Sequence, residues 1–191
     1  MTTFLFIIIG AYVVGNMLTG MIISRFFYKK EICVEGSGNP GARNAGRLYG
    51  KKVFVATFIG DALKGAFVVL AAKQLGYGAD VELLALFSVI FGHIYPILYK
   101  FRGGKGVSTF IGGLFAFDLL VFGLFVGLFI LFYPFFKSFT LAGLSTILLM
   151  PIIVLGFSCG TFASITACFV SVLVIYAHRD DLKRNFTKEK G

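Results

Sequence analysis

The stretch VSTFIGGLFAFDLLVFGLFVGLFILFYPFF, residues 107–136, decides how this chain folds. The whole stretch is too long for one ordinary membrane span, while a helix over residues 107–117 alone would be only about 16 Å long. The hydrocarbon core of a bilayer is roughly 30 Å thick. Asp118 is the only charged residue in the stretch, and it stands where the two parts would divide. The number of crossings here determines on which side of the membrane the chain ends.

The composition is typical of a membrane protein. Hydrophobic residues make up 58% of the 191 residues and charged residues only 14%, and the mean hydropathy is +0.89. A soluble domain of this length needs far more polar surface, so we predict an all-α integral membrane protein with residues 1–191 in a single domain. The first apolar run lacks a small-residue cleavage site after it and should be a retained span. The apolar runs cover residues 4–24, 53–72, 82–99, 107–117, 119–136, 139–157 and 160–177.

The distribution of positive charge predicts the topology. The net charge is +9, with seven Lys and Arg residues in loop 25–52 and five in the tail after residue 177. Basic loops stay on the cytoplasmic side, so both segments should lie there. One span precedes the loop, which places the N-terminus outside, and a cytoplasmic tail then requires an odd number of crossings. We therefore expect seven transmembrane helices, the fourth of them short (107–117), with a cytoplasmic C-terminus.

The basic residues do not indicate a nucleic-acid partner. Their positions mark one membrane face and suit anionic lipid or an anionic substrate. The cysteines are Cys33, Cys159 and Cys168, and their spacing is not that of metal ligands. We expect no nucleic acid, no disulfide, no metal and no cofactor.

The segment GSGNPGARNAGR, residues 36–47, is a polar loop between two apolar runs. Its glycines permit positive φ and close backbone approach, and successive N–H groups in such a loop can form an anion-binding nest. Its neutral polar side chains and arginines would add hydrogen bonds to phosphate oxygens. A solvated, turn-rich connector is the alternative interpretation. The candidate phosphate ligands in this loop are Gly36, Ser37, Gly38, Asn39, Arg43, Asn44 and Arg47.

A second polar cluster, GHIYPILYKFRGGKG at residues 92–106, should lie on the same membrane face. Pro96 is expected to kink the preceding helix near its cytoplasmic end. Glycines and a lysine at a helix N-terminus are typical of a phosphate site, although the spacing is not that of a Walker A motif. The alternative is a basic juxtamembrane loop beside a packing histidine. The candidates here are Gly103, Gly104, Lys105 and Gly106, with His93 in a positioning role.

Three further charged or titratable residues need an explanation. Asp61 and Lys64 lie three residues apart in an apolar run, so they share a helical face, and an ion pair inside the bundle is the least costly way to bury both. His178 opens the tail segment HRDDLKR (178–184) and could close over a cytoplasmic site or simply mark a snorkelling span end. The chain lacks an H-x-x-x-x-D acyltransferase motif, and its polar clusters suit phosphate binding rather than a strong nucleophile, so a covalent acyl-serine mechanism has little support.

Five segments together resemble the motifs of one family. GSGNPGARNAGR resembles the pattern GSGN-x-GATN-x-x-R, and residues 92–109 resemble a G-H-x-x-P helix followed by F-x-G-G-K-G-V-A-T. FTLAG (139–143) is similar to V-S-L-A-S, HRDDLKR to H-R-x-N-I-x-R-L, and DALKG (61–65) to D-x-x-K-G. Over its whole length the chain therefore resembles the bacterial acyl-phosphate:glycerol-3-phosphate acyltransferases, the PlsY family.

The resemblance implies a compact seven-span protein in the bacterial plasma membrane, with its N-terminus outside and its active site on the cytoplasmic side. Members of the family transfer an acyl chain from acyl-phosphate to the 1-hydroxyl of glycerol-3-phosphate. The products are lysophosphatidic acid and phosphate, in the first acylation of phospholipid synthesis. Neither acyl-CoA nor acyl carrier protein takes part. The expected partners are the two substrates and membrane lipid, and the protein is expected to be a monomer.

The resemblance also implies roles for individual residues. The enzyme mainly has to bring two phosphorylated substrates together and neutralise them, and the phosphate of acyl-phosphate is expected to take the hydroxyl proton. The acyl tail should lie between helices. The residues carried over as catalytic are Ser37, Arg47, Lys105 and His178, and Asn44, Thr140 and Asp181 stand at phosphate-binding positions.

Several residues depart from the family pattern. A carboxylate at Asp181, where the family has Asn, should repel phosphate, and Arg43, in place of Thr, adds a compensating positive charge. The two could pair, or Asp181 could face solvent while Arg43 binds substrate alone. These changes leave open a paralogue that acylates another phosphorylated acceptor. A transporter or binding protein for an anionic metabolite is a further alternative, although we detect no inverted repeat. The other departures are Pro40, for an apolar residue, and Gly143, for Ser.

Overall fold

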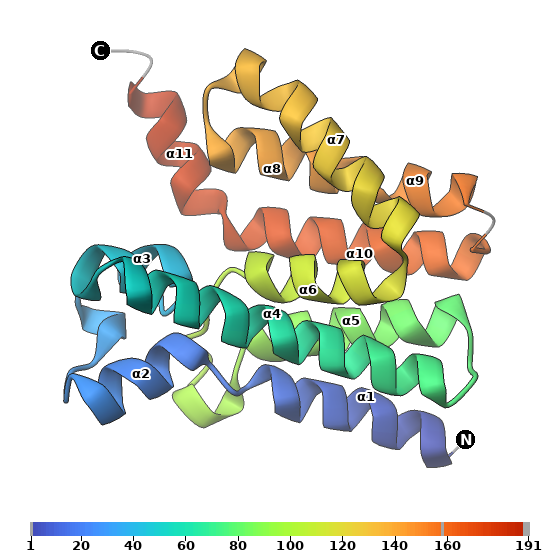
Figure 1. The fold of residues 1–191 in the computed structure, drawn as a ribbon, viewed down its shortest axis with the longest axis horizontal. Coiled ribbons are helices and arrows are strands. Elements are labelled where there is room, and N and C mark those ends of the chain that lie inside the picture. Colours follow the sequence, from blue (N-terminus) through green and yellow to red (C-terminus); the bar gives the residue numbers. More distant parts are fainter. Residues whose placement is uncertain (1, 158, 189–191) are drawn as a thin grey trace.

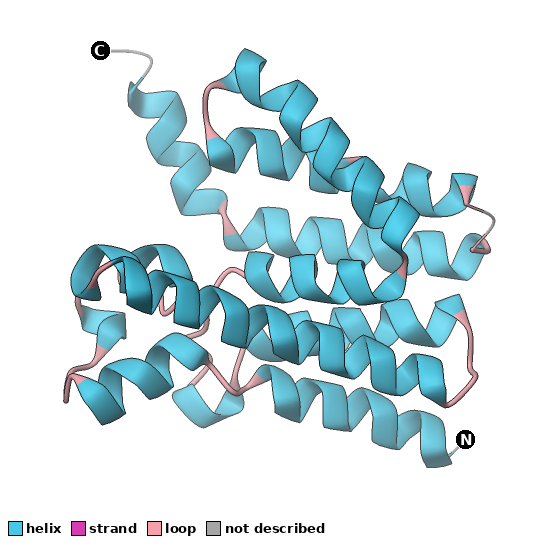
Figure 2. Cartoon of the chain, in the orientation of Figure 1, coloured by secondary structure: helices cyan, strands magenta, loops and turns pink. Residues whose placement is uncertain are grey.

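The computed structural model describes residues 2–157 and 159–188. Ser158 and the end of the basic tail, including Lys190, lie outside the described residues. The described part is built from α-helices and two short 3-10 helices, at Ile32–Val34 and Ile97–Tyr99 (Figures 1 and 2). The α-helices are α1 (Thr2–Gly15), α2 (Thr19–Phe27), α3 (Ala42–Tyr49), α4 (Lys51–Gln74), α5 (Ala79–Ile94), α6 (Val107–Phe117), α7 (Leu119–Phe136), α8 (Phe139–Leu148), α9 (Met150–Gly156), α10 (Thr161–Ala177) and α11 (Arg179–Lys188).

The helices confirm the all-α membrane class. Among the described residues, three segments are long and apolar enough to cross a bilayer: Lys51–Gln74, Ala79–Tyr99 and Leu119–Phe136. The count rises to five if each of two bent pairs forms one span, α1 with α2 at 40° and α8 with α9 at 41°. Helices α6 and α10 are apolar but shorter. The structure therefore has three to five candidate spans by length and composition.

The predicted division of residues 107–136 is confirmed. Helix α6 ends at Phe117 and α7 begins at Leu119, with Asp118 extended between them. The Asp118 carboxylate accepts hydrogen bonds from the backbone N–H groups of Leu120 (2.8 Å) and Val121 (2.9 Å). These groups would otherwise lack partners at the start of a helix, so the carboxylate caps α7 and starts it in a new direction.

The first apolar run, expected to be one helix, is broken between α1 and α2 by contacts from α4. Lys64 Nζ donates to the carbonyl oxygens of Gly15 (3.1 Å) and Met17 (2.8 Å), which the break leaves free. Thr19 donates to Asp61 Oδ1 through its backbone N–H (3.3 Å) and its hydroxyl (3.1 Å). The ion pair predicted between Asp61 and Lys64 is present at 3.2 Å, with both side chains buried.

Two other segments correct the sequence-based expectation. Residues 139–157 were expected to be one helix but form α8 and α9, with Pro151 in the first turn of α9, where it cannot continue the preceding helix. Loop 25–52 contains a short helix, α3, and the start of α4. The buried side of α3 is formed by the small residues Ala42 and Ala45 together with Asn44, so apolar periodicity does not reveal it.

Glycines bring the helix backbones into contact at the centre of the molecule. A Cβ added at Gly65 of α4 would lie 2.1 Å from the carbonyl oxygen of Thr109 in α6, and one at Gly112 of α6 would lie 1.9 Å from that of Ala62 in α4. Small residues allow this approach in membrane helices. The close contact fixes α6 against α4, and with it the segment just before α6 that carries Lys105.

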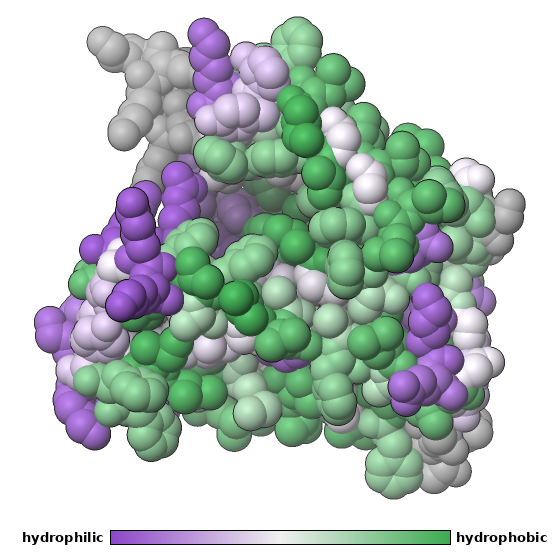
Figure 3. Space-filling view, in the orientation of Figure 1, coloured by the Kyte–Doolittle hydropathy of each residue, from purple (hydrophilic) through white to green (hydrophobic). Residues whose placement is uncertain are grey.

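The outer surface is largely apolar. Figure 3 shows hydrophobic residues over most of the visible face, with hydrophilic residues gathered around α2 and α3 and a smaller group at the opposite edge, near the end of α4. Large side chains such as Phe67 and Ile130 are more than 60% exposed. An exposed apolar surface of this extent suits lipid as the surrounding medium.

Candidate active site

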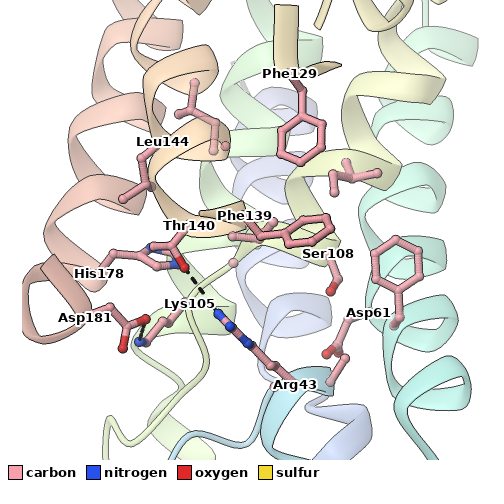
Figure 4. Close-up of a pocket in the computed structure, with 18 of the residues that line it drawn as sticks. Arg43, Asp61, Lys105, Ser108, Phe129, Phe139, Thr140, Leu144, His178 and Asp181 are labelled. Atoms are coloured by element: carbon pink, nitrogen blue, oxygen red, sulfur yellow. Dashed lines mark hydrogen bonds and ion pairs between the residues drawn. The ribbon is translucent and has the colours of Figure 1, made fainter. Parts of the chain in front are cut away.

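A cavity of about 620 Å³ lies where α3, α4, α6, α7 and α8 meet the junction of α10 and α11. Figure 3 shows a hollow with hydrophilic residues at its floor where α3, α6 and α8 converge. Figure 4 shows charged and polar side chains at one end of the cavity and Phe129 and Leu144 at the other. The polar and charged lining residues are Asn39, Arg43, Asp61, His93, Lys105, Ser108, Thr140, His178 and Asp181.

The loop that precedes α3 is organised around Asn44. Asn44 Oδ1 accepts from the backbone N–H of Ser37 and its Nδ2 donates to the carbonyl oxygen of Glu35, both at 3.0 Å. Gly36 and Gly38 have φ of +60° and +72°. A Cβ at Gly36 would lie 2.4 Å from Asn44 Oδ1, so the turn requires glycine for two reasons. The buried Asn44 amide therefore shapes the loop, and it does not line the cavity.

Arg43 brings α3 to α8. Its Nη1 donates to Thr140 Oγ1 at 3.2 Å, which joins residues 97 positions apart in the sequence. Arg47 lies one turn further along α3, on the same side of the helix, but its side chain is exposed and does not line the cavity. The structure thus places Arg43, rather than Arg47, at the cavity wall.

The glycine segment before α6 holds Lys105 in place. The Gly104 N–H donates to the His93 carbonyl at 3.0 Å. A Cβ at Gly103 would lie 2.1 Å from that same oxygen, and one at Gly104 would lie 2.1 Å from His93 Nε2. No side chain fits at either position, so these two glycines pack the segment against the end of α5. Lys105, between Gly104 and Gly106, lines the cavity. Gly106 has φ of +80° and directly precedes α6.

Lys105 forms an ion pair with Asp181 of α11, in direct contact between Nζ and Oδ2 (Figure 4). Burial alone would raise the pKa of the Asp181 carboxyl, but the hydrogen bond and the charge of Lys105 outweigh burial and lower it. The ion pair that we expected between Arg43 and Asp181 is not formed. Asp181 does not face solvent alone, and its ion-pair partner is Lys105, while Arg43 bonds to Thr140.

His178 stands at the junction of α10 and α11, next to this ion pair. Its Nδ1 is 2.8 Å from the carbonyl oxygen of Val174. A carbonyl can only accept, so Nδ1 carries the proton and Nε2 has a free lone pair when the ring is neutral. Burial lowers the pKa of His178, which favours the neutral ring. With this ring neutral, its Nε2 is a hydrogen-bond acceptor beside the two cations Lys105 and Arg43.

A buried polar network lies behind the cavity. Lys64 Nζ is 2.8 Å and Thr109 Oγ1 is 3.3 Å from His93 Nδ1. Asp61 and His93 line the cavity, whereas Lys64 does not. An ammonium group can only donate, so His93 Nδ1 accepts and Nε2 carries the proton. Lys64 thereby links the cavity wall to the break between α1 and α2.

The comparison with known families agrees with this geometry. The family model described as glycerol-3-phosphate acyltransferase matches residues 5–188. The chain belongs to the glycerol-3-phosphate acyltransferase family. This assignment confirms the resemblance that the motifs indicated.

Individual members of the acyltransferase family are similar over nearly their full length. The glycerol-3-phosphate acyltransferase 1 of Bacillus cereus is 49% identical over 173 residues, which cover 91% of this chain and 95% of that protein. The glycerol-3-phosphate acyltransferase 1 of Desulfitobacterium hafniense is 34% identical over 184 residues, covering 96% of this chain and 91% of that protein.

Two crystal structures of PlsY, an integral membrane glycerol 3-phosphate acyltransferase, share the fold. The glycerol 3-phosphate form has a TM-score of 0.88 at 29% identity, and the lysophosphatidic acid form has a TM-score of 0.84 at 30% identity. Each comparison covers 97% of this chain and 93% of that chain. The integral membrane class of the chain rests on this likeness as well as on its own helices.

The predicted site residues of this acyltransferase-family member fall into two groups. Those that line the cavity are Asn39, Arg43, Asp61, His93, Lys105, Gly106, Thr140, His178 and Asp181. Those that do not are Gly36, Ser37, Gly38, Asn44, Arg47, Lys64, Gly103 and Gly104. Most of the second group belong to the two glycine segments or to the network behind the wall. The glycines and Asn44 among them shape the segments that border the cavity.

The apolar wall of the cavity was not predicted from the sequence. Phe122, Phe125, Val126 and Phe129 line it from α7. Their spacing puts them on one face of a helix, but α7 is apolar on all sides, so the pattern alone cannot distinguish this face from the lipid-facing one. Other cavity-lining residues that were not named as candidates are Gly41, Ala42, Phe54, Phe58, Val107, Ser108, Ile111, Phe139, Gly143, Leu144 and Ile147.

Proposed function

We propose that this chain is a membrane enzyme that transfers an acyl chain from acyl-phosphate to the 1-hydroxyl of glycerol-3-phosphate, giving lysophosphatidic acid and inorganic phosphate. The observation that carries the proposal is the cavity itself, which joins a cationic end with Arg43 and Lys105 to an apolar end with Phe129 and Leu144. Acyl-phosphate has a matching division into phosphate and hydrocarbon. Membership of the family supports the acceptor, and the names of its relatives support the reaction.

The chemistry asks little of the protein beyond position and charge. The 1-hydroxyl oxygen attacks the acyl carbonyl carbon, a new ester bond forms, and the bond between that carbon and the phosphate oxygen breaks. The hydroxyl proton leaves with the departing phosphate. Two cations neutralise the phosphates and hold them together, and this kind of preorganised charge is a large part of catalysis in many enzymes. His178, with Nε2 free of the Val174 carbonyl, would accept a hydrogen bond from the acceptor hydroxyl.

Lys105 and Arg43 bind phosphate at the cavity wall, Thr140 holds Arg43, and His178 completes the acceptor site. Ser37 and Arg47 remain proposed phosphate ligands on the strength of the motif alone, because neither lines the cavity. The glycines at 36, 38, 103, 104 and 106 supply backbone shape.

We also propose seven crossings in one domain of the bacterial plasma membrane, with the cavity facing the cytoplasm and the protein a monomer. Counting each bent pair as one span, and adding the short helices α6 and α10 to the three long segments, gives seven segments in chain order. This number agrees with the cytoplasmic placement of loop 25–52 and the tail that their charge favours. Labelling of a cysteine at residue 37 from outside intact cells would contradict this topology.

The reaction is tested by phosphate release from acyl-phosphate by the purified protein in detergent, with a panel of acceptors. Release that depends on glycerol-3-phosphate, together with lysophosphatidic acid formation, is the expected result. Release only with another phosphorylated alcohol would instead support a paralogue with a different acceptor, a possibility that the carboxylate of Asp181 within the cavity raises. No release with any acceptor would contradict an acyltransferase and favour a transporter or binding protein.

A further inference from the structure

Asp181 stands where a phosphate ligand of Lys105 would stand. The two side chains come from segments 76 positions apart, the glycine segment before α6 and the first turn of α11, and their charged atoms are in direct contact. Both side chains line the cavity and both are partly exposed, 23% for Lys105 and 32% for Asp181. The ion pair therefore lies at the cavity surface, where a dissolved anion can reach it.

The other cation at this end of the cavity is differently engaged. Arg43 bonds to the neutral hydroxyl of Thr140, so it keeps its full charge for a ligand. Lys105 already has an anionic partner. A phosphate that binds Lys105 must either displace the Asp181 carboxylate or bind beside it, and two like charges a few ångströms apart repel each other even at a protein surface.

We propose that Asp181 is a specificity-determining residue. Its carboxylate competes with phosphate for Lys105 and so weakens the binding of every anion that enters the site. This inference rests on the proposed function. A phosphate ester can still bind, because further contacts through its hydroxyls or its acyl chain compensate for this competition. Inorganic phosphate, which the reaction releases, has no such contacts. The carboxylate therefore speeds the loss of inorganic phosphate and limits inhibition by this product.

The test is direct binding of inorganic phosphate to the purified protein, by isothermal titration calorimetry at low ionic strength without acyl donor. Asp181→Asn removes the competing charge and keeps a similar shape. We expect it to bind phosphate about tenfold more tightly than the wild type, within the range found for coupled contacting charges. Asp180→Asn is the matched control, since Asp180 is the adjacent carboxylate, exposed and outside the cavity lining. It should stay within about twofold of the wild type, as expected for a surface charge.

Equal or weaker phosphate binding by Asp181→Asn would overturn the inference, because it would mean that the carboxylate only positions Lys105. Tighter binding in both variants would also overturn it, since the effect would then be one of net charge. If Asp181→Asn does not fold, as judged by its melting transition, Asp181→Ser makes the same charge change with a smaller side chain and carries the same expectation.

A turnover assay separates this inference from the proposed reaction. If the wild type turns over acyl-phosphate with glycerol-3-phosphate but Asp181→Asn shows the same inhibition constant for phosphate, the reaction stands and the inference fails. If the wild type shows no turnover while Asp181→Asn still binds phosphate more tightly, the inference about Lys105 stands and the proposed reaction fails.

Discussion

Lys64 Nζ lies 2.8 Å from His93 Nδ1, so a lysine of α4 and a histidine of α5 share a hydrogen bond inside the helix bundle. The same ammonium group contacts Asp61 and the free carbonyl oxygens of Gly15 and Met17. One side chain thus satisfies the break in the first apolar run and fixes the ring of a cavity-lining histidine. The shape of the cavity depends on this buried group.

Lys64→Met should strongly destabilise the protein. It leaves the buried Asp61 carboxylate without its cation and two carbonyl oxygens without a donor. Removing one partner of a buried ion pair costs about 3–5 kcal/mol. The measurement is the melting temperature in detergent, with Lys51→Met at the exposed start of α4 as a control that should be unchanged. Asp61→Asn combined with Lys64→Met should recover part of the loss, and a double variant as unstable as the sum of the singles would contradict the pairing.

Gly104→Ala should lower both the activity and the stability of the protein even though it adds only a methyl group. The new Cβ would lie 2.1 Å from His93 Nε2, and the ring cannot move away without losing its contact with Lys64. Overpacking of this kind costs about 1–3 kcal/mol and displaces neighbouring groups, here the segment that carries Lys105. We expect reduced turnover and a lower melting temperature. Gly127→Ala in α7 is the control, because nothing lies within 4 Å of its added Cβ. Wild-type behaviour of Gly104→Ala would refute this packing.

The features that could be predicted from sequence are those that local chemistry decides. Asp118 interrupts an apolar run, and a lone carboxylate there has one inexpensive use, the capping of a helix, which it fulfils. Asp61 and Lys64 can be paired from their spacing alone. The break between α1 and α2 cannot be predicted, since its stabilising contacts come from residues more than 40 positions away.

The composition of the cavity was predictable only in part. Motifs pointed to Lys105, Thr140 and His178 from distant parts of the chain, and the structure places all three on one cavity. Motif position could not tell that Asn44 faces its own loop or that Asp181 pairs with Lys105, because both depend on how α3 and α11 pack.

Gly143→Leu should shift the preference of the enzyme toward shorter acyl chains. Gly143 lines the cavity, and a Cβ there would only just reach Phe129 Cε2, at 4.0 Å, so a larger side chain would project into free space. The KM for glycerol-3-phosphate should change little, because this part of the cavity is apolar. The measurement is kcat/KM for a series of acyl-phosphates of increasing length. Gly127→Leu, at an exposed position of α7 outside the cavity lining, should leave the series unchanged. An equal loss at every chain length would argue against this position as a wall of the acyl site.

Lys105→Ala and Arg47→Ala should each reduce kcat/KM severely while the protein still folds. Losing a charge-assisted hydrogen bond costs about 1.5–3 kcal/mol, which corresponds to roughly 10- to 150-fold. Lys52→Ala, exposed near the start of α4, is the control for a lost surface charge.

For Arg47 the experiment decides between two interpretations. The motif implies that Arg47 binds phosphate, whereas the structure leaves it outside the cavity lining. Unchanged turnover in Arg47→Ala would remove it from the site and leave Arg43 as the arginine that binds phosphate.

Thr140→Val should act through Arg43. The substitution keeps the side-chain shape but removes the oxygen that accepts from Arg43 Nη1 at 3.2 Å, so the guanidinium loses its fixed position at the cavity wall. We expect a higher KM for glycerol-3-phosphate, with Thr140→Ser close to the wild type because it keeps the hydroxyl. Arg43→Met should lower kcat/KM at least as much, and Thr140→Val should lower it little further in the double variant, since residues in contact are energetically coupled by about 0.5–3 kcal/mol.

A second pair of variants tests which residue Arg43 contacts. Arg43 makes its hydrogen bond to Thr140 and not to Asp181, so the effects of Arg43→Met and Asp181→Asn should be closer to additive than those of Arg43→Met and Thr140→Val. The reverse order of couplings, measured on kcat/KM, would mean that Arg43 turns to Asp181 when substrate is bound.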